Sequence, residues 1–467
     1  MSTIVLIKAG RKSVRQHYSP PLGIMSIAAY GRERAPGTDF RLIDMLTEDL
    51  TPEEAAERAL GLAPDLVGIS AMSYQAEAMK ALARECKARR PELPVIAGGP
   101  HPSTHPADAL SDGVDLVVRG EGELTFLELL PRLLAGERRP ADIPGIAFRR
   151  GGELVLTPPR EEFAPPDSLP TPAYDLIDLR RYWDLPRFGT TCVHREYAVL
   201  STSRACPYQC TYCHRLFGSR YRAQSPEIVL RDLETLARDY RVREIQFVDD
   251  CFNLDKARVA AICDGIVERG LDLNIWAYAR VDSVKDSMID KLARAGVRWL
   301  AFGIEAASGK VRADVDKDFA DELLYDVLGK VRAAGIHVIG NYIFGLPEDD
   351  HASMQKTLDL ALELNCEFAN FYCTMAYPGS ALYERAVVEG WPLPETWGGY
   401  SQHSVDTLPL PTRHLSAAEV LRFRDGAFQT YFQNPDYLRA VEHRFGPAVL
   451  QEIRQMSAHR LERRHGG

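Results

Sequence analysis

Three cysteines within eight residues carry the most specific chemistry in this sequence. Cys206, Cys210 and Cys213 are spaced C-x3-C-x2-C in the segment STSRACPYQCTYCHR. Loop thiolates at such short spacing can converge on one metal centre, and three of them suit a [4Fe–4S] cluster that keeps one iron free of protein ligands. That open iron can bind a small molecule through an amine and a carboxylate. The alternative is a structural zinc site, but zinc prefers four closed ligands, and His214 is poorly placed beside Cys213 to complete them.

The other six of the nine cysteines are scattered along the chain. An odd number of cysteines in a long chain that opens with a predicted strand, not a signal peptide, argues against a disulfide framework and favours a reducing cytoplasm. Cys251, Cys263, Cys366 and Cys373 are expected to be small core hydrophobes. Cys192 lies near the entrance of the domain that follows, with no motif to assign it a role.

The elements that must position the cysteine triplet form an alternating series of strands and helices. The predicted strands are 197–203, 244–249, 273–279, 298–304, 337–344 and 368–375, and the predicted helices are 226–240, 255–269, 286–295, 319–334, 350–364 and 379–389. Six βα units are too few for a closed eight-stranded barrel. The sequence therefore predicts a partial barrel over residues 196–400, with its site at the carboxyl ends of the strands.

The first third of the chain predicts a separate, doubly wound α/β domain over residues 1–135. Its strands, expected at 2–9, 40–45, 65–70, 94–99 and 114–120, are continuous apolar runs, as in a sheet covered on both faces. Residues 136–195 are rich in Pro, Arg and Asp and are interpreted as a linker with one hairpin turning at Gly151-Gly152. Residues 401–467 are predicted to be helical, ending in a solvated basic tail.

Composition narrows the class of protein. The 467 residues are 45% hydrophobic and 26% charged, which excludes a disordered, collagen-like or coiled-coil chain. Because the net charge is −9, we do not expect the protein to bind nucleic acid through bulk charge. No apolar run approaches the roughly 20 residues that a membrane span needs.

At the triplet the sequence resembles the radical S-adenosylmethionine (SAM) superfamily. Cys206, Cys210 and Cys213 match its CxxxCxxC signature, and Tyr212 supplies the aromatic residue before the third cysteine. That superfamily uses a partial (β/α)6 barrel, in agreement with the predicted elements. The resemblance implies a [4Fe–4S] cluster whose free iron binds SAM, and a low-potential electron donor of the flavodoxin or ferredoxin type.

The resemblance also implies which residues contact SAM. Asp249 and Asp250 replace the usual Gly-Gly-Glu after the second barrel strand, and Asp250 is equally well interpreted as a helix cap. Arg280 and Glu305 are favoured as site residues because charged groups that end apolar strands need partners. The SAM-contacting residues expected from the resemblance are Tyr212, Asp249, Arg280, Glu305, Ser308, Asn341, Gly345 and Tyr377.

The predicted first domain, placed before such a barrel, resembles the cobalamin-binding subclass of the superfamily. The segments PPLGIMSIAAY, GGPHPS and GEGE carry this resemblance, and glycines at strand ends let a large flat ligand approach the backbone. The cobalamin-contacting residues that it implies are Ser70, Ser73, Gly98, Gly99, His101, Gly120 and Glu121. Many such domains provide a cobalt ligand from D-x-H-x-x-G. Here His17 lacks the accompanying aspartate and glycine, and we expect no ligation by it.

The resemblance implies methyl transfer to an unactivated carbon of a small molecule. In that chemistry one SAM methylates cobalamin, and a second SAM yields the radical that removes a substrate hydrogen. Rearrangement, cyclisation or oxidation without methylation is the first alternative, and a non-catalytic cobalamin or metal sensor is the second. Substrate contacts are sought among aromatic and imidazole groups near the barrel mouth, at Trp391, Trp397, Tyr400 and His403.

Overall fold

The computed structural model describes residues 1–10, 19–185 and 194–466. The chain divides into two compact units, Met1–Leu185 and Pro186–Gly467. Within the described residues, no helix combines the length and apolar character needed to cross a bilayer.

The first unit is built on one mixed sheet with the order β2-β1-β3-β4-β5-β6-β7. Strands β1 to β5 pair in parallel, in the 2-1-3-4-5 order of a doubly wound fold, so the predicted fold class is confirmed. The strands are β1 (Ser2–Lys8), β2 (Thr38–Asp44), β3 (Leu66–Ser70), β4 (Val95–Gly98), β5 (Leu116–Val118), β6 (Ile146–Arg150) and β7 (Glu153–Leu156).

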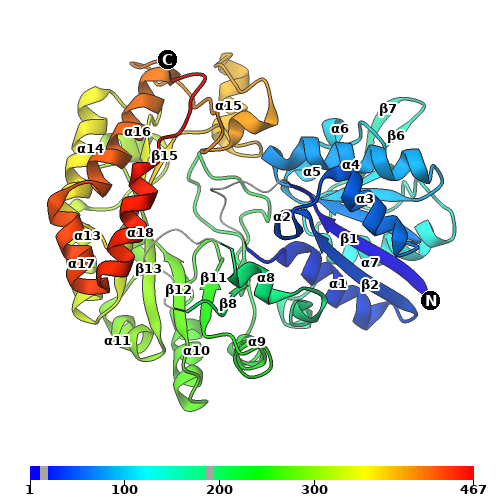
Figure 1. Ribbon diagram of the computed structural model, residues 1–467, viewed down its shortest axis with the longest axis horizontal. Helices are drawn as coiled ribbons and strands as arrows, with labels where there is room; N and C mark the ends of the chain where they lie inside the picture. The colour runs from blue at the N-terminus through cyan, green and yellow to red at the C-terminus, as the bar shows by residue number, and fades with distance from the viewer. Residues whose placement is uncertain (11–18, 186–193, 467) are drawn as a thin grey trace. The chain divides into compact units, whose positions relative to one another are not determined.

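Helices cover both faces of this sheet, and each face has its own buried core (Figure 1). Ala28 of α1 and Leu129 of α7 pack in one core, and Ala55 of α3 and Met79 of α4 pack in the other. The helices of this unit are α1 (Leu22–Arg34), α2 (Met45–Glu48), α3 (Pro52–Gly61), α4 (Ala76–Arg89), α5 (Pro100–Thr104), α6 (Pro106–Ala109), α7 (Glu123–Leu134) and α8 (Leu179–Trp183).

The segment interpreted as a linker contributes to the first unit. Strands β6 and β7 form the predicted hairpin, and Gly151 and Gly152 turn it with φ angles of 60° and 88°. β6 pairs antiparallel to β5, so the hairpin extends the sheet. Because the hairpin buries Ile146, Ala147 and Phe148 in the cores of the sheet, the unit continues past residue 135 to Leu185.

The second unit contains the expected partial barrel. Its six strands all pair in parallel and follow one another in sequence order, β8-β11-β12-β13-β14-β15. Figure 1 shows them as a curved open sheet with helices on the outside. The strands are β8 (Tyr197–Leu200), β11 (Glu244–Phe247), β12 (Asn274–Ala279), β13 (Val297–Glu305), β14 (His337–Phe344) and β15 (Phe368–Cys373), and a small pair consists of β9 (Ser203–Arg204) and β10 (Arg222–Ala223).

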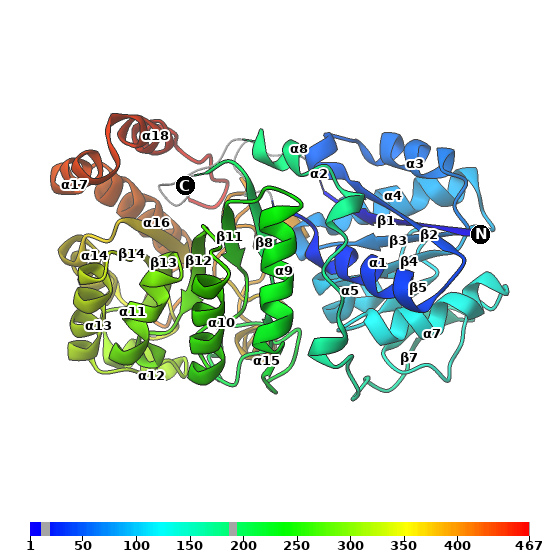
Figure 2. The same cartoon turned by 90° about the horizontal axis from the view of Figure 1, so that it is seen from below.

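The six predicted barrel helices lie within two residues of their expected bounds at each end, and the short α12 is an addition that was not predicted. Figure 2 shows α9 and α10 side by side along the sheet. Asp255 caps α10, as expected, by accepting a hydrogen bond from the Arg258 amide at 3.0 Å. The helices are α9 (Pro226–Arg238), α10 (Lys256–Glu268), α11 (Asp286–Arg294), α12 (Gly309–Asp314), α13 (Asp321–Ala333), α14 (His351–Leu364) and α15 (Ala381–Glu389).

Three further helices, α16 (Ala417–Phe432), α17 (Pro435–Phe445) and α18 (Pro447–Ala458), complete the predicted helical region. Side chains of α16 hydrogen-bond to the backbone of β15, an edge strand of the sheet, and of the residues just before it. Tyr431 Oη donates to the Cys366 carbonyl, just before β15, at 2.6 Å, and Arg424 Nε donates to the Phe371 carbonyl at 2.8 Å. An exposed edge would offer unpaired backbone groups to other chains, and these contacts prevent that.

The sequence predicted a solvated basic tail, but part of this tail is buried. The Arg463 side chain is only 6% exposed and pairs with Asp425 of α16. Its charge therefore serves an internal contact.

Candidate cluster and cofactor sites

The cysteine triplet lies on the loop between β9 and β10, directly after the first barrel strand. The loop is anchored to neighbouring elements, because the Thr211 amide donates to the Val315 carbonyl and the Leu382 amide donates to the Thr211 carbonyl. Cys210 is buried and Cys213 partly faces solvent. Surrounding protein atoms, then the thiols of Cys210 and Cys206 among other groups, raise the pKa of Cys213 to about 12. All three thiols lie on this one short loop.

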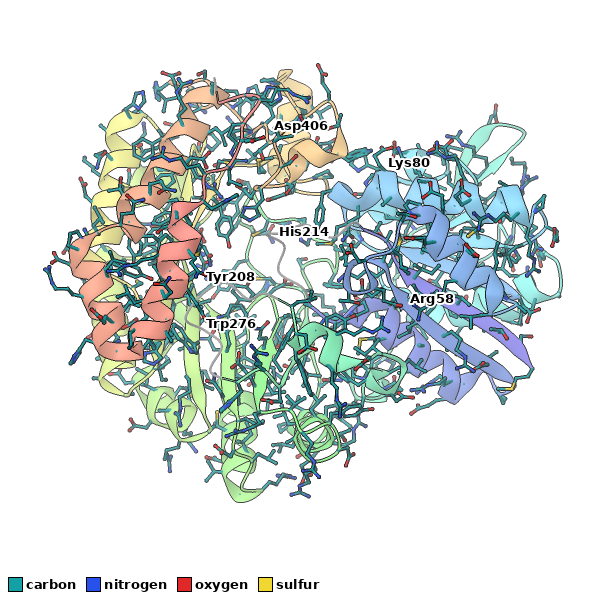
Figure 3. All side chains as sticks on the ribbon, viewed as in Figure 1. Arg58, Lys80, Tyr208, His214, Trp276 and Asp406 are labelled. Atoms are coloured by element: carbon teal, nitrogen blue, oxygen red, sulfur yellow. The ribbon has the colours of Figure 1, made fainter. Side chains whose placement is uncertain are left out.

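The spacing of these cysteines along the chain suits a cluster better than a single zinc ion. Four thiolates around one zinc, with Zn–S bonds of about 2.3 Å, lie roughly 3.8 Å apart. In the described part of the chain, no three Cys, His, Asp or Glu side chains are gathered closely enough to hold one ion. His214 is exposed and joins Ser380 in a backbone bridge (Figure 3).

The remaining cysteines agree with the core interpretation. Cys251, Cys263, Cys366 and Cys373 are all buried. Burial raises the pKa of each thiol, which makes them poor nucleophiles. Cys192 lies outside the described residues.

Arg280 lies against the cysteine loop. Its guanidinium donates two hydrogen bonds to Asp282, at 3.0 and 2.9 Å, and a third to Cys210 Sγ at 3.8 Å. The same group stacks over the ring of Tyr208 at 3.7 Å. A buried cation is therefore held beside a thiol of the triplet.

Glu305 ends β13 and forms a buried ion pair. Its Oε1 accepts a hydrogen bond from Lys317 Nζ at 3.0 Å, and both side chains are less than 10% exposed. Glu305 has a φ of 65° at a bulge in the β13–β14 pairing, which is an unusual conformation for a non-glycine residue. A Cβ on Gly303 would lie 2.3 Å from this carboxylate, so only glycine leaves room for the pair.

Tyr212 and Asn341 complete this side of the barrel rim. Burial and the nearby Glu305 carboxylate raise the pKa of Tyr212 well above its ordinary value. Asn341 Nδ2 donates to the Phe302 carbonyl at 3.0 Å, and its Oδ1 accepts from Asn370 at 3.0 Å. Of these residues predicted to contact SAM, Glu305 ends β13, Tyr212 lies on the cysteine loop, and Asn341 lies within β14.

Asp249, predicted to contact SAM, has protein partners in the structure. It is completely buried, and its carboxylate accepts hydrogen bonds from the amide and hydroxyl of Thr202 and from the Ser203 hydroxyl, at 2.6 to 2.7 Å. Those contacts occupy the carboxylate in bracing the turn after β8. Asp250, in contrast, is exposed to solvent.

Gly345 and Ser308 also have local structural roles. A Cβ on Gly345 would lie 2.3 Å from Val420 of α16, and its amide donates to Asp349 at 3.0 Å. Ser308 caps α12 by accepting a hydrogen bond from the Val311 amide at 3.4 Å. Neither residue needs a ligand to explain its identity.

Tyr377 turns its hydroxyl into the protein, where it accepts a hydrogen bond from Gln402 Nε2 at 3.3 Å. Burial raises its pKa to about 12. Only its backbone and ring faces therefore remain for contact with a ligand.

Of the four groups suggested at the barrel mouth, three take part in packing. Trp391 lies against the cluster around Leu382 and beneath Arg385, and Trp397 stacks on the buried Tyr400. His403 is exposed.

The inner face of the barrel sheet retains accessible aromatic surface. Side chains alternate along β12, so Trp276 and Tyr278 share a face with Arg280, and Figure 3 labels Trp276 and Tyr208 inside the curve of the sheet. Tyr278 is 40% exposed although its strand is paired on both sides. Its partner on β13 is the small Ala301, which leaves the ring uncovered.

The strand ends of the first unit carry glycines and hydroxyls. Ser70 ends β3, Gly98 ends β4, and Ser73 begins the turn after β3. Gly99 has a φ of 93°, and a Cβ there would lie 2.8 Å from Ser70 Oγ. Gly120 has a φ of 74° in open space, so a ligand can approach its backbone directly.

The charged residues predicted for cobalamin lie deeper. His101 is fully buried, and its Nε2 is 2.9 Å from Asp108 Oδ2. This contact gives the imidazole a protein partner, so His101 supports the α5–α6 segment and does not project a ring toward a ligand. Glu121 is buried beside Gly120. His17 lies outside the described residues.

Sequence reasoning missed Lys317, Tyr208 and Gln402, which hold Glu305, Arg280 and Tyr377. Each belongs to a loop or turn without regular periodicity. A cysteine motif can be recognised by its spacing in the sequence, whereas these partners can be recognised only in the folded structure.

Two protein-family models match the chain. The B12 binding domain covers residues 11–130, and the radical SAM superfamily covers residues 200–361.

Among known proteins, the uncharacterized methyltransferase PH0819 of Pyrococcus horikoshii is 31% identical over 90% of this chain and 89% of its own. The anaerobic magnesium-protoporphyrin IX monomethyl ester cyclase of Rubrivivax gelatinosus is 26% identical over 78% of this chain and 66% of its own. Among solved structures, the radical SAM methyltransferase TsrM of Kitasatospora setae, with cobalamin and a [4Fe–4S] cluster bound, superposes with a TM-score of 0.71 at 20% identity, over 83% of this chain and 78% of its own.

Both domain matches occur on one chain, in the order that the fold shows, and the Pyrococcus relative aligns along nine tenths of it. The cysteine loop fits a [4Fe–4S] cluster, and the glycine-lined strand ends fit a large planar ligand. This chain belongs to the radical SAM enzymes that carry a B12-binding domain, and its cofactors are a [4Fe–4S] cluster, SAM and cobalamin.

Proposed function

We propose that this enzyme transfers a methyl group from SAM to an unactivated carbon of a small molecule. The observation that carries the proposal is the alignment of PH0819, a relative named as a methyltransferase, along both units of the chain. The fold shared with TsrM supports the same reading. When bound, the cluster supplies an electron for SAM cleavage, and cobalamin supplies methyl-carrier chemistry.

The protein's own residues bind and orient these groups. We assign Cys206, Cys210 and Cys213 as the cluster ligands. Arg280, beside Cys210, offsets part of the negative charge of the thiolates. The loop contacts to Val315 and Leu382 keep the triplet in place before any cofactor arrives.

SAM carries a carboxylate, an amine and a sulfonium, and the barrel rim offers charges of both signs. We assign Glu305, Arg280, Tyr212 and Asn341 to the SAM site, together with the backbone near Tyr377. Lys317 holds Glu305 through its buried ion pair, so the carboxylate does not need to reorganise when SAM binds. Asp249, Ser308 and Gly345 are left out because protein contacts account for them.

In the first unit, we assign the backbone around Gly98, Gly99 and Gly120, with Ser70 and Ser73, to cobalamin. The inner barrel face at Trp276 and Tyr278 provides aromatic surface that excludes water from the reacting groups. The reductant is proposed to be a low-potential flavodoxin or ferredoxin.

The decisive experiment uses SAM labelled in its methyl group. The enzyme, reconstituted without oxygen, is incubated with cobalamin, reductant and the small-molecule fraction of a cell extract. A methyltransferase yields S-adenosylhomocysteine and 5′-deoxyadenosine in comparable amounts and transfers label to one compound. Formation of 5′-deoxyadenosine alone, with no labelled compound, would refute the proposal.

A second candidate is a radical cyclisation without methyl transfer. The Rubrivivax relative, named as a cyclase, aligns over 78% of this chain, and this chain spans about two thirds of that protein. Cyclisation predicts 5′-deoxyadenosine without S-adenosylhomocysteine, so the same experiment separates the two candidates.

A further inference from the structure

Arg463, in the segment after α18, has an unusually complete set of contacts. A guanidinium has five N–H donors, and here five hydrogen bonds of 2.7 to 3.1 Å lead from it. They go to both carboxylate oxygens of Asp425, to the Thr407 hydroxyl, and to the carbonyls of Gln402 and Ser404. An arginine committed in this way fixes the segment around residues 402–407 against α16.

Gln402 passes this constraint to the end of β15. Its side-chain Oε1 accepts from the Cys373 amide at 3.1 Å, and its Nε2 donates to the Cys373 carbonyl at 2.8 Å. The same Nε2 donates to Tyr377 Oη at 3.3 Å. The amide thus pairs with the last residue of the edge strand as a neighbouring strand would, and it also holds the tyrosine that follows.

The chain held in this way is the segment Met375–Pro378, assigned above to SAM through its backbone. The strand end is also tied from its other side, since the Thr374 amide donates to the Phe344 carbonyl at 2.9 Å and the Leu410 amide donates to the Thr374 carbonyl at 2.9 Å. Arg463 and Gln402 complete the set of contacts that define the path of this segment. Misplacing bound groups by about 1 Å can cost about 100-fold in rate, so the path of a binding segment must be closely fixed.

We propose that Arg463 is a positioning residue for SAM, acting through Gln402 on the segment Met375–Pro378. The inference rests on the proposed SAM site at that segment. It does not depend on whether the enzyme methylates or cyclises its substrate.

The test compares Arg463→Gln with Arg460→Gln, an exposed arginine three residues earlier. SAM is titrated into the anaerobically reconstituted, reduced enzyme, and the change in the electron paramagnetic resonance signal of the cluster is followed. We expect Arg463→Gln to raise the midpoint about tenfold, equivalent to about 1.4 kcal/mol. The signal at saturating SAM, the iron content and the cobalamin content should match those of the parent, and Arg460→Gln should match in every respect.

Two further variants separate positioning from simple stabilisation. Gln402→Leu should raise the midpoint to a similar degree, and the double variant should show less than the sum of the two effects, because both act on one segment. Arg463→Lys should recover part of the affinity by reaching Asp425. If Arg463→Gln fails to fold, the same measurements on Gln402→Leu test the proposal.

An unchanged SAM midpoint with a lowered melting temperature would show that Arg463 contributes only to stability, and would overturn the inference. A changed limiting signal or lost iron would also overturn it, because the effect would then lie at the cluster. Neither result concerns methyl transfer, since the titration contains no substrate.

Discussion

The carboxyl strand ends of the two sheets carry opposite chemistry. In the barrel, Arg280 and Glu305 end apolar strands, and each is paired with another charged residue inside the protein. In the first unit, the corresponding positions are Ser70, Gly98 and the turn glycine Gly120. These barrel strand ends present fixed charge, whereas the ends of β3 to β5 present backbone. The charged ends of β1 and β2, Lys8 and Asp44, pair with each other at 3.8 Å.

This difference matches the ligands of the family. SAM is small and zwitterionic, so its recognition requires charges that are already oriented. Cobalamin is large, and glycines, which have no side chain, let it approach the backbone closely. The charged groups of the first unit accordingly turn inward, as Asp44 does when it accepts a hydrogen bond from Tyr182 Oη at 2.7 Å.

Removing one cluster ligand should give the largest effect. We expect Cys206→Ala, Cys210→Ala or Cys213→Ala to abolish the oxygen-sensitive cluster absorbance and to reduce SAM cleavage to background. Cobalamin content should remain at the parental level, because the first unit is built from its own sheet and cores. Absorbance, iron content and labelled-SAM cleavage measure these outcomes.

Cys263→Ala is the matched control for the triplet. This thiol is buried in α10, so its replacement should lower stability slightly and leave the cluster intact. A triplet variant that still cleaved SAM reductively would contradict the assignment of the cluster.

Breaking the Glu305–Lys317 pair should give the next largest effect. Lys317→Met leaves a buried carboxylate without its partner, which typically costs about 3–5 kcal/mol of stability. We expect SAM affinity to fall at least tenfold, and both losses can be measured by denaturant unfolding and SAM titration.

The double variant Glu305→Gln/Lys317→Met separates stability from binding. Without a buried charge, most of the lost stability should return, while SAM affinity should stay low. Recovery of both quantities together would indicate that the pair serves only the fold.

These residues also show what a sequence can reveal. The cysteine spacing and the apolar strands predicted the cluster loop, the barrel and the rim positions of Arg280 and Glu305, because strand ends in parallel sheets meet at one edge. Lys317 could not be predicted, since it follows a short helix and reaches Glu305 only through the bulge at Gly303. Asp249 shows the limit of such reasoning, because a carboxylate at a strand end has the same sequence signature whether it binds a ligand or braces a turn.

The backbone surface of the first unit can be tested with a pair of glycines. Gly120 and Gly37 have φ angles of 74° and 87°, and a Cβ at either position meets no protein atom within 4 Å. Gly120→Ala and Gly37→Ala should therefore lose similar stability, about 1 kcal/mol each. Only Gly120→Ala should weaken cobalamin binding, by about tenfold, as measured by spectrophotometric titration. Equal affinities in the two variants would remove Gly120 from the site.

The smallest expected effect is a loss of local stability around His105 in acid. Burial, with a contribution from His101, lowers the pKa of His105 below 6.5, and Asp108 only partly opposes this. As the pH falls through 6.5, the unfolded chain takes up the proton before the folded chain does, so stability is retained above 6.5 and lost below it. The loss is at most about 1.4 kcal/mol per pH unit. His105→Gln does not titrate in this range and should flatten the dependence.

Amide hydrogen exchange in α5 and α6 measures this local stability between pH 7 and pH 5, after correction for the intrinsic exchange rate. The parent protein should lose protection in acid, and His105→Gln should keep it. An identical acid response in both proteins would place the sensitivity elsewhere.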